Sequence, residues 1–216
     1  MLSVKKEKLL IVDFGSQYTH LIARRVRELG VYSEIIPYSS WTSTEDVKGV
    51  ILSGGPMSVW SNDSPKVSLE IIRQTMKRKI PVLGICYGFQ LIAWLFGGEV
   101  IASPSGEYGP TTLHITNESS LFRGLPRKIR VWMSHRDIVK NLPKKFTSIA
   151  RTNKCPIAAF ESVDGIIFGV QFHPEVYHTE YGIKILENFL EICGFSRIWR
   201  VESCLLYTSP SPRDRG

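Results

Sequence analysis

Hydrophobic positions in the first hundred residues follow two alternating patterns. Short continuous apolar runs indicate buried strands, and runs with apolar residues three or four positions apart indicate helices. Short connections containing glycine, serine and proline separate them. This order predicts an α/β fold with a doubly wound, mostly parallel sheet flanked by helices. The expected strands are 8–14, 32–36, 47–52 and 80–85, and the expected helices are 18–29, 64–76 and 89–96.

The second half of the chain shows a different pattern, with short β-prone segments separated by turn residues. We therefore expect antiparallel strands that extend the sheet along one side. A final amphipathic helix is expected over 181–193, and Gly194 ends it. The expected strand segments are 99–101, 111–115, 129–133, 146–151, 157–160 and 166–171.

Length and composition indicate one globular domain. The chain has 216 residues, of which 43% are hydrophobic, which is enough for one well-formed core and marginal for two. We assign this domain to residues 1–196. Residues 197–216 have no periodicity, and their mixture of proline, serine and arginine favours disorder. We expect them to be the start of a linker followed by a tail that is foreign to the natural protein.

The net charge of +7 is spread over separate clusters of lysine and arginine. Aromatic residues do not interleave with these clusters in the manner of a nucleic-acid-binding motif, so we expect no nucleic-acid partner. Solvated helix faces explain most of the charge. Docking on an acidic partner or on another domain is the alternative, and Arg24, Arg25 and Arg27 are the candidates for it.

No apolar run approaches the length of a membrane span, so we expect no membrane association. The apolar run 9–12 is too short for the core of a signal peptide. The cysteines, Cys86, Cys155, Cys193 and Cys204, show no C-x-x-C spacing, which disfavours a metal site or a disulfide framework. We therefore expect a cytoplasmic protein with reduced thiols and no bound metal.

The segment 84–88, Gly-Ile-Cys-Tyr-Gly, joins the strand expected at 80–85 to the next helix. It has the pattern of a nucleophile elbow, with cysteine in place of the more familiar serine. Glycines permit the close backbone approaches that so sharp a turn requires. Cys86 would then lie at a helix N-terminus, where the positive end of the helix stabilises a thiolate. The alternative is an inert cysteine buried in a glycine-rich turn.

A cysteine nucleophile needs a base and a group that orients the base. His173-Pro174-Glu175 offers both, because residues i and i+2 of an extended segment point to the same side. Glu175 would hold one ring nitrogen of His173, and the other nitrogen would face Cys86. The chain order also differs from that of α/β-hydrolases, in which the acid precedes the histidine, and this argues against an esterase. The alternative is a turn with a surface carboxylate.

The loop 53–56, Ser-Gly-Gly-Pro, follows the third expected strand. Its bare backbone could approach Cys86, so that the N–H groups of Gly55 and Tyr87 would form an oxyanion hole. A phosphate-binding glycine loop is the alternative, but neither standard phosphate-loop motif occurs in the chain.

Three motifs together resemble those of the class I (triad) glutamine amidotransferases. They are 53–56 (SGGP), 84–90 (GICYGFQ) and 170–175 (VQFHPE). Further segments are similar to the glutaminase domain of GMP synthetases, namely 13–18 (DFGSQY), 23–32 (ARRVRELGVY) and 131–137 (VWMSHRD). The resemblance covers roughly residues 7–195, with all motifs in order. It implies a flavodoxin-like three-layer fold, in agreement with the hydrophobic pattern.

The resemblance implies an enzyme that hydrolyses glutamine to glutamate and ammonia. Cys86 would attack the side-chain amide, His173 would transfer the protons, and Glu175 would orient His173. No cofactor is expected for this step. The residues implied to hold the amino-acid end of glutamine are Gln90, Ser134, His135 and Asp137.

The same resemblance implies a partner. Ammonia would pass to the ATP-pyrophosphatase domain or subunit of a GMP synthetase, which uses ATP and Mg²⁺ to aminate XMP to GMP. That synthetase half is absent from this sequence, so we expect either a truncated gene product or a free-standing subunit, and the unusual tail favours truncation.

Arg136 departs from the family pattern, which often has glycine at this position of the substrate-binding loop.

The main hypothesis, a glutaminase that serves GMP synthesis, has two alternatives. One is the glutaminase of another amidotransferase pathway, which the segment 13–18 disfavours. The other is a non-catalytic or regulatory relic domain.

Overall fold

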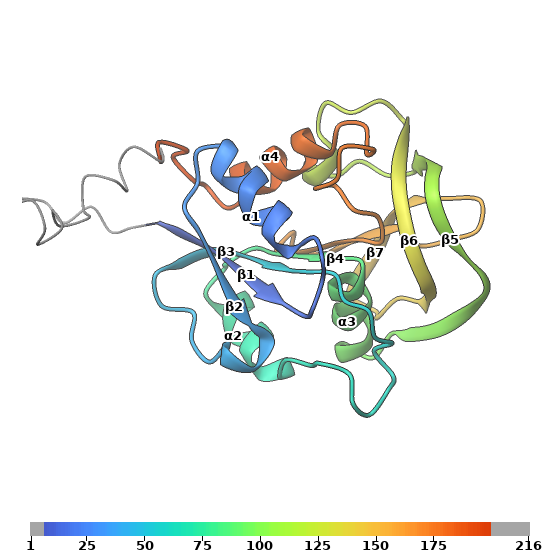
Figure 1. Ribbon diagram of the computed structural model, residues 1–216, viewed down its shortest axis with the longest axis horizontal. Helices are drawn as coiled ribbons and strands as arrows, with labels where there is room; N and C mark the ends of the chain where they lie inside the picture. Colours follow the sequence, from blue (N-terminus) through green and yellow to red (C-terminus); the bar gives the residue numbers. More distant parts are fainter. Residues whose placement is uncertain (1–6, 200–216) are drawn as a thin grey trace, which may run out of the picture.

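The computed structural model describes residues 7–199 of the chain. A nine-stranded sheet forms its centre, with helices on both faces (Figure 1). No helix within this range is long and apolar enough to cross a membrane. The strands are β1 (Lys8–Asp13), β2 (Ser33–Pro37), β3 (Val47–Leu52), β4 (Val82–Ile85), β5 (Glu99–Ile115), β6 (Lys128–Asn141), β7 (Phe146–Arg151), β8 (Ala159–Ser162) and β9 (Ile167–Val170). The helices are α1 (Thr19–Glu28), α2 (Leu69–Lys77), α3 (Tyr87–Leu95) and α4 (Gly182–Ile192), with short 3₁₀ turns η1 (Tyr38–Ser40) and η2 (Ser120–Phe122).

The parallel part of the sheet has the order β2-β1-β3-β4-β9. Strands such as β4, Val-Leu-Gly-Ile, are buried throughout because helices cover both faces. Figure 1 shows α1 and α4 on one face and α2 and α3 on the other. The order continues as β8-β7-β5-β6, with antiparallel neighbours. This architecture confirms the predicted doubly wound α/β sheet with antiparallel strands added in the second half.

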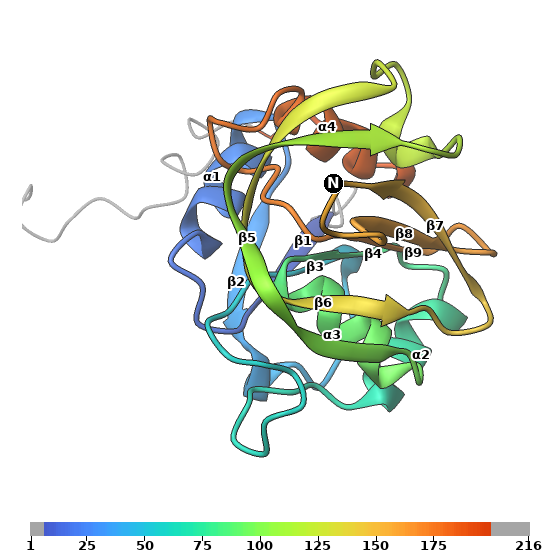
Figure 2. The same cartoon turned by 90° about the vertical axis from the view of Figure 1, so that its right-hand side faces the viewer.

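A long ribbon of β5 and β6 dominates the antiparallel part and curves across the molecule in Figure 2. The prediction of separate strands at 99–101 and 111–115 was wrong, because 99–115 is one strand. β6 likewise extends beyond the predicted segment 129–133. Proline and glycine interrupt the local strand pattern of β5, but pairing with β6 on both sides of an irregularity between Ala102 and Glu107 keeps it one strand.

Helix α2 begins later than the sequence predicted. The pair Ser64-Pro65 suggested its start, but Ser68 is the N-cap, and its Oγ accepts a hydrogen bond from the Ile71 N–H at 3.2 Å. Ser64 Oγ instead donates to the Ser61 carbonyl at 2.7 Å. Both serines are plausible caps, and local sequence could not distinguish them.

The residues that follow α4 pack on the domain as far as the structure describes them. Arg197 pairs with Glu187 at 2.8 Å and donates to the Leu29 carbonyl at 3.2 Å. The Trp199 N–H donates to the Gly30 carbonyl at 2.9 Å. The domain boundary after residue 196 stays a prediction, and most of the predicted tail, 200–216, lies outside the described residues.

Candidate active site

Cys86 lies at the turn between β4 and α3, and its backbone is strained, with φ 52° and ψ −101°. A positive φ is uncommon for a non-glycine residue, and such conformations gather at active sites. Two glycines make the turn possible. A Cβ at Gly84 would lie 2.6 Å from the Gly88 carbonyl, and a Cβ at Gly88 would lie 2.4 Å from the Leu52 carbonyl oxygen. The turn therefore has the geometry of a nucleophile elbow.

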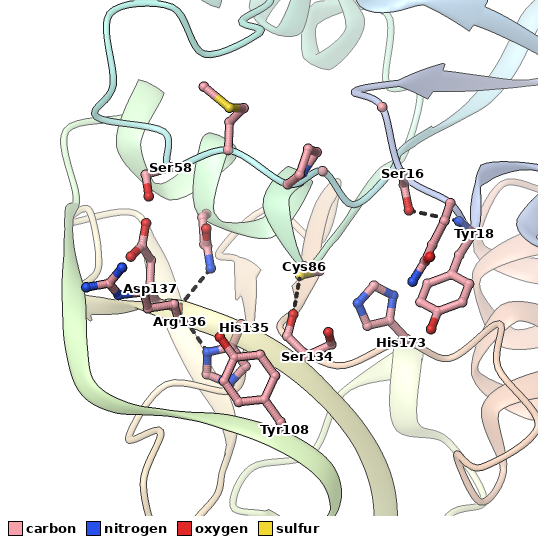
Figure 3. A pocket seen from close by; sticks show the side chains of 16 residues that line it. Ser16, Tyr18, Ser58, Cys86, Tyr108, Ser134, His135, Arg136, Asp137 and His173 are labelled. Atoms are coloured by element: carbon pink, nitrogen blue, oxygen red, sulfur yellow. Dashed lines mark hydrogen bonds between the residues drawn. The ribbon is translucent and has the colours of Figure 1, made fainter.

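A cleft of about 580 Å³ contains Cys86 at the carboxyl ends of the parallel strands (Figure 3). Its volume lies within the range of small-molecule sites. Loops that follow β1 and β3 contribute to it from one side, and the ribbon strands β5 and β6 contribute from the other. The cleft is lined by 15–18, 55–58, Cys86, Gln90, Tyr108, 134–137 and His173.

His173 and Glu175 follow β9, and both are buried. His173 Nδ1 and Glu175 Oε1 lie 2.7 Å apart, a short hydrogen bond that orients the ring. The main chain of the segment is held as well. The His173 N–H donates to the Trp132 carbonyl at 3.1 Å, and the Thr179 hydroxyl donates to the His173 carbonyl at 2.6 Å. The imidazole therefore has a defined position and orientation in the cleft.

The surroundings of His173 favour its protonated form. Burial alone lowers the pKa of the imidazole, but the Glu175 carboxylate and the Cys86 sulfur outweigh burial and raise that pKa well above its ordinary value. An imidazolium beside a cysteine stabilises the thiolate, which is the nucleophilic form. Thiol and imidazole can therefore share one proton within the cleft.

Gly54 shows how closely the thiol and the imidazole approach each other. A Cβ at this position would lie 3.2 Å from His173 Cε1, 3.3 Å from Ser16 Oγ and 3.7 Å from Cys86 Cβ. Figure 3 shows Cys86 and the His173 ring facing the same region of the cleft. The structure therefore brings together Cys86, His173 and Glu175, the three residues predicted to act in catalysis.

Gly55 and Tyr87, the predicted oxyanion-hole donors, are neighbours. A Cβ at Gly55 would lie 3.2 Å from Tyr87 Cγ. The Tyr87 N–H belongs to the first turn of α3, so it has no partner within the helix. Within residues 7–199, the Gly55 N–H donates no hydrogen bond. Two available donors next to Cys86 are what a developing oxyanion requires.

The four predicted glutamine-binding residues line the same cleft, but they differ in how available they are. Gln90 is committed to the protein, because its Nε2 donates to the Asp137 carbonyl at 2.9 Å and to Gln171 Oε1 at 3.0 Å. Asp137 is available, because its buried Oδ1 has no hydrogen-bond partner in the part of the chain described. Its carboxylate points toward Ser58 across the cleft in Figure 3. A buried carboxylate oxygen of this kind suits an ammonium group.

Ser134 and His135 complete the predicted set. The Cys86 thiol donates to the Ser134 carbonyl, with sulfur and oxygen 3.7 Å apart. His135 is buried, and its Nδ1 lies 2.9 Å from the Asp137 carbonyl oxygen. Main-chain carbonyls of β6 therefore contact both the nucleophile and the side chains that surround it.

Sequence reasoning missed three residues of the site. Gln171 Nε2 donates to Cys86 Sγ at 3.7 Å, and the Tyr18 ring packs edge-on against His173 with 5.1 Å between centroids. Both residues belong to motifs already recognised, so the signal for them was present. Glu107, which contacts His135, belongs to none of those motifs.

Arg136 is exposed at the cleft. Its φ is not positive, so an arginine adds no backbone strain at this position.

Among the proposed docking residues, Arg25 Nε donates to the Glu175 carbonyl at 3.3 Å, and Arg27 Nη2 donates to the Ser33 carbonyl at 2.9 Å. These two arginines therefore stabilise the domain itself, whereas the Arg24 side chain is 72% exposed and pairs with Glu28 of the same helix.

Comparison with known families matches residues 10–193 to the glutamine amidotransferase class-I family. The GMP synthase (glutamine-hydrolyzing) of Petrotoga mobilis is 49% identical over 194 residues, which cover 89% of this chain and 38% of that protein. The corresponding protein of Clostridium tetani is 48% identical over 206 residues, covering 93% of this chain and 39% of that protein. The chain thus spans less than half the length of these curated relatives.

Solved structures agree with this assignment. A Thermoplasma acidophilum protein, provisionally described as one of the subunits of a GMP synthase, is 37% identical with a TM-score of 0.79, and the match covers 87% of this chain and 94% of that chain. A glutamine amidotransferase from Thermotoga maritima shares the fold at 22% identity, with a TM-score of 0.65 and coverage of 86% and 81%.

Proposed function

The chain belongs to the class I glutamine amidotransferases, and from this premise we propose that it hydrolyses glutamine to glutamate and ammonia. One observation carries the proposal. A thiol on a strained elbow, Cys86, shares a cleft with His173, whose Nδ1 lies 2.7 Å from a Glu175 carboxylate oxygen. This is the arrangement that nucleophilic catalysis by cysteine requires.

In the first half of the proposed reaction, Cys86 Sγ attacks the side-chain amide carbon of glutamine. Negative charge develops on the amide oxygen, and the N–H groups of Gly55 and Tyr87 stabilise it, each contributing roughly 3–4 kcal/mol. His173 donates its proton to the departing nitrogen. Ammonia leaves, and a γ-glutamyl thioester remains on Cys86.

In the second half, neutral His173 accepts a proton from water as the water attacks the thioester. Collapse of the resulting intermediate releases glutamate and restores the Cys86 thiolate and the His173 imidazolium. Glu175 keeps the ring oriented and stabilises its charged form in both halves. The chain itself supplies nucleophile, acid, base and oxyanion donors, so we propose no cofactor for this step.

We propose that the amino-acid end of glutamine binds along β6. The partnerless Asp137 carboxylate oxygen would accept hydrogen bonds from the substrate ammonium group. Ser134 and His135 would shape the adjacent surface. Gln90 would act mainly by holding the Asp137 peptide, since its amide nitrogen is already bonded there.

We further propose that the ammonia serves the amination of XMP to GMP, because the curated relatives are named GMP synthases. The partner would be an ATP-pyrophosphatase domain or subunit, and ATP and Mg²⁺ would belong to that half. We place the reaction in the cytoplasm, because the nucleophile must stay a reduced thiol. Cys86, Cys155 and Cys193 are all free.

Ammonia release from glutamine, measured with and without a GMP synthetase pyrophosphatase domain, tests the proposal. Cys86→Ala should lower release by about 1000-fold or more. Cys193→Ala is the matched control, because this buried thiol does not line the cleft. Unchanged release in Cys86→Ala would refute the mechanism. Stimulation by the synthetase of another pathway, and not by that of GMP synthesis, would refute the assigned product.

A further inference from the structure

A buried polar cluster adjoins β6, and the proposed reaction does not account for it. Glu107 on β5 is paired directly with His135 on β6, and their side chains are 5% and 1% exposed. A carboxylate is almost never buried so completely unless partners replace its lost hydration. The Thr152 hydroxyl supplies one partner, at 2.8 and 3.0 Å from the two carboxylate oxygens. His135 supplies the other.

Both ring nitrogens of His135 have a partner. Nδ1 lies 2.9 Å from the Asp137 carbonyl oxygen, which can only accept a hydrogen bond. Nε2 lies 3.3 Å from Glu107 Oε2. Nδ1 must therefore carry a proton, and a second hydrogen bond joins Nε2 to Glu107. Contacts at both ring nitrogens fix the orientation of the His135 ring.

His135 in turn holds the main chain of β6 at the cleft. The Asp137 carbonyl accepts from His135 and from Gln90, so side chains of two elements fix one peptide group. The same residue lines the cleft and carries the buried carboxylate oxygen that has no partner in the described part of the chain. Glu107 does not line the cleft. Its carboxylate can therefore act on a bound substrate through His135.

We propose that Glu107 is a positioning residue for glutamine binding, an inference that rests on the proposed function. Glu107 holds the His135 ring through Nε2, and His135 holds the Asp137 peptide through Nδ1, in the orientation that receives the ammonium group of the substrate. A shift in strand register between Ala102 and Glu107 brings Glu107 opposite His135. Such bulges re-aim side chains near active sites.

A metal ion is the other cation that this cluster could hold, since ligand atoms of Glu107, His135 and Cys155 lie within 4.8 Å of one another. The hydrogen bonds within this cluster favour bound protons over a metal ion. Cys155 Sγ donates to the Ile157 carbonyl at 3.1 Å, and burial, followed by the charge of Glu107, raises the pKa of this thiol to about 12. Metals bind the thiolate, which is disfavoured here.

Glu107→Gln tests the proposal, because it preserves shape and removes the charge. In the full chain, alkylation of Cys86 is timed with a glutamine analogue bearing an electrophile at the γ position, and with iodoacetamide, which has no amino-acid end. We expect the rate of Cys86 alkylation by the analogue to fall by about tenfold or more. The rate of alkylation by iodoacetamide should change by less than about twofold. KM for glutamine should rise while kcat changes little. Glu99→Gln, at an exposed position of β5, is the matched control.

Several outcomes would overturn the proposal. An unchanged analogue rate in Glu107→Gln would remove the positioning role, and an equal fall in both rates would assign a general structural role instead. A stoichiometric metal in the purified wild type, lost in Glu107→Gln, would replace the proton with a metal. If the glutamine analogue did not alkylate Cys86 of the wild type faster than iodoacetamide does, the proposed function itself would be refuted. Nitrogen NMR of His135 should show a proton on Nδ1, whatever the activity.

Discussion

The two halves of the sheet contribute to the cleft in different ways. In the parallel half, reactive groups lie in loops just beyond strand ends, as Cys86 does after β4 and His173 after β9. In the ribbon, the contacts come from the middle of a strand, residues 134–137 of β6. Parallel strands are covered on both faces, so only their ends can meet a ligand. The ribbon curves along the cleft and can present a strand face.

This difference suggests that the two halves have separable tasks. The parallel half holds the groups proposed for bond breaking, and the ribbon holds the groups proposed to receive the amino-acid end of glutamine. Variants of the first should therefore lower kcat, and variants of the second should raise KM. Three substitutions test this separation.

Glu175→Gln should have the largest effect. We expect kcat to fall by about 100-fold or more, because the ring of His173 loses its charged partner. Burial lowers the pKa of His173 and the Glu175 charge raises it, so removing that charge lowers the pKa. The alkaline limb of the pH–rate profile, where the imidazolium is lost, should then move to lower pH. Glu180→Gln, a nearby exposed carboxylate, is the control, and an unmoved alkaline limb would contradict the role of Glu175.

Asp137→Asn should act on binding. The substitution removes the negative charge that faces the substrate ammonium, so KM for glutamine should rise by about 10- to 100-fold with kcat changed by less than about threefold. Steady-state kinetics over a range of glutamine concentrations measures both. Asp63→Asn, at an exposed position outside the cleft, should leave both constants unchanged. A fall in kcat at constant KM would break the separation between the two halves.

Arg136→Gly should have the smallest effect. The side chain is exposed and forms no ion pair within residues 7–199, so KM should change by less than about threefold. Stability should fall by roughly 0.5–1 kcal/mol, because glycine gains backbone freedom in the unfolded chain. Urea denaturation and glutamine kinetics measure the two effects. If KM changed tenfold, the guanidinium would have to be counted among the substrate contacts.

The sequence predicted the parallel half more accurately than the ribbon. Strand 47–52 was predicted with its observed bounds, because its apolar residues Val50, Ile51 and Leu52 lead directly into the turn residues of 53–56. The ribbon strand β5 was predicted as two pieces, because its proline and glycine residues read locally as turns. Pairing with β6 overrides that local signal.

The sequence by itself determined the local geometry around the nucleophile. Glycines on either side of Cys86, and the i+2 spacing of His173 and Glu175, act over a few residues, so their consequences can be read without a fold. Only the tertiary structure decided that Glu107 faces His135 and that Gln171 reaches the sulfur of Cys86. These contacts depend on strand register and on which side chains meet in the core. Neither is encoded in any short stretch, because both are set by the packing of segments far apart in the chain.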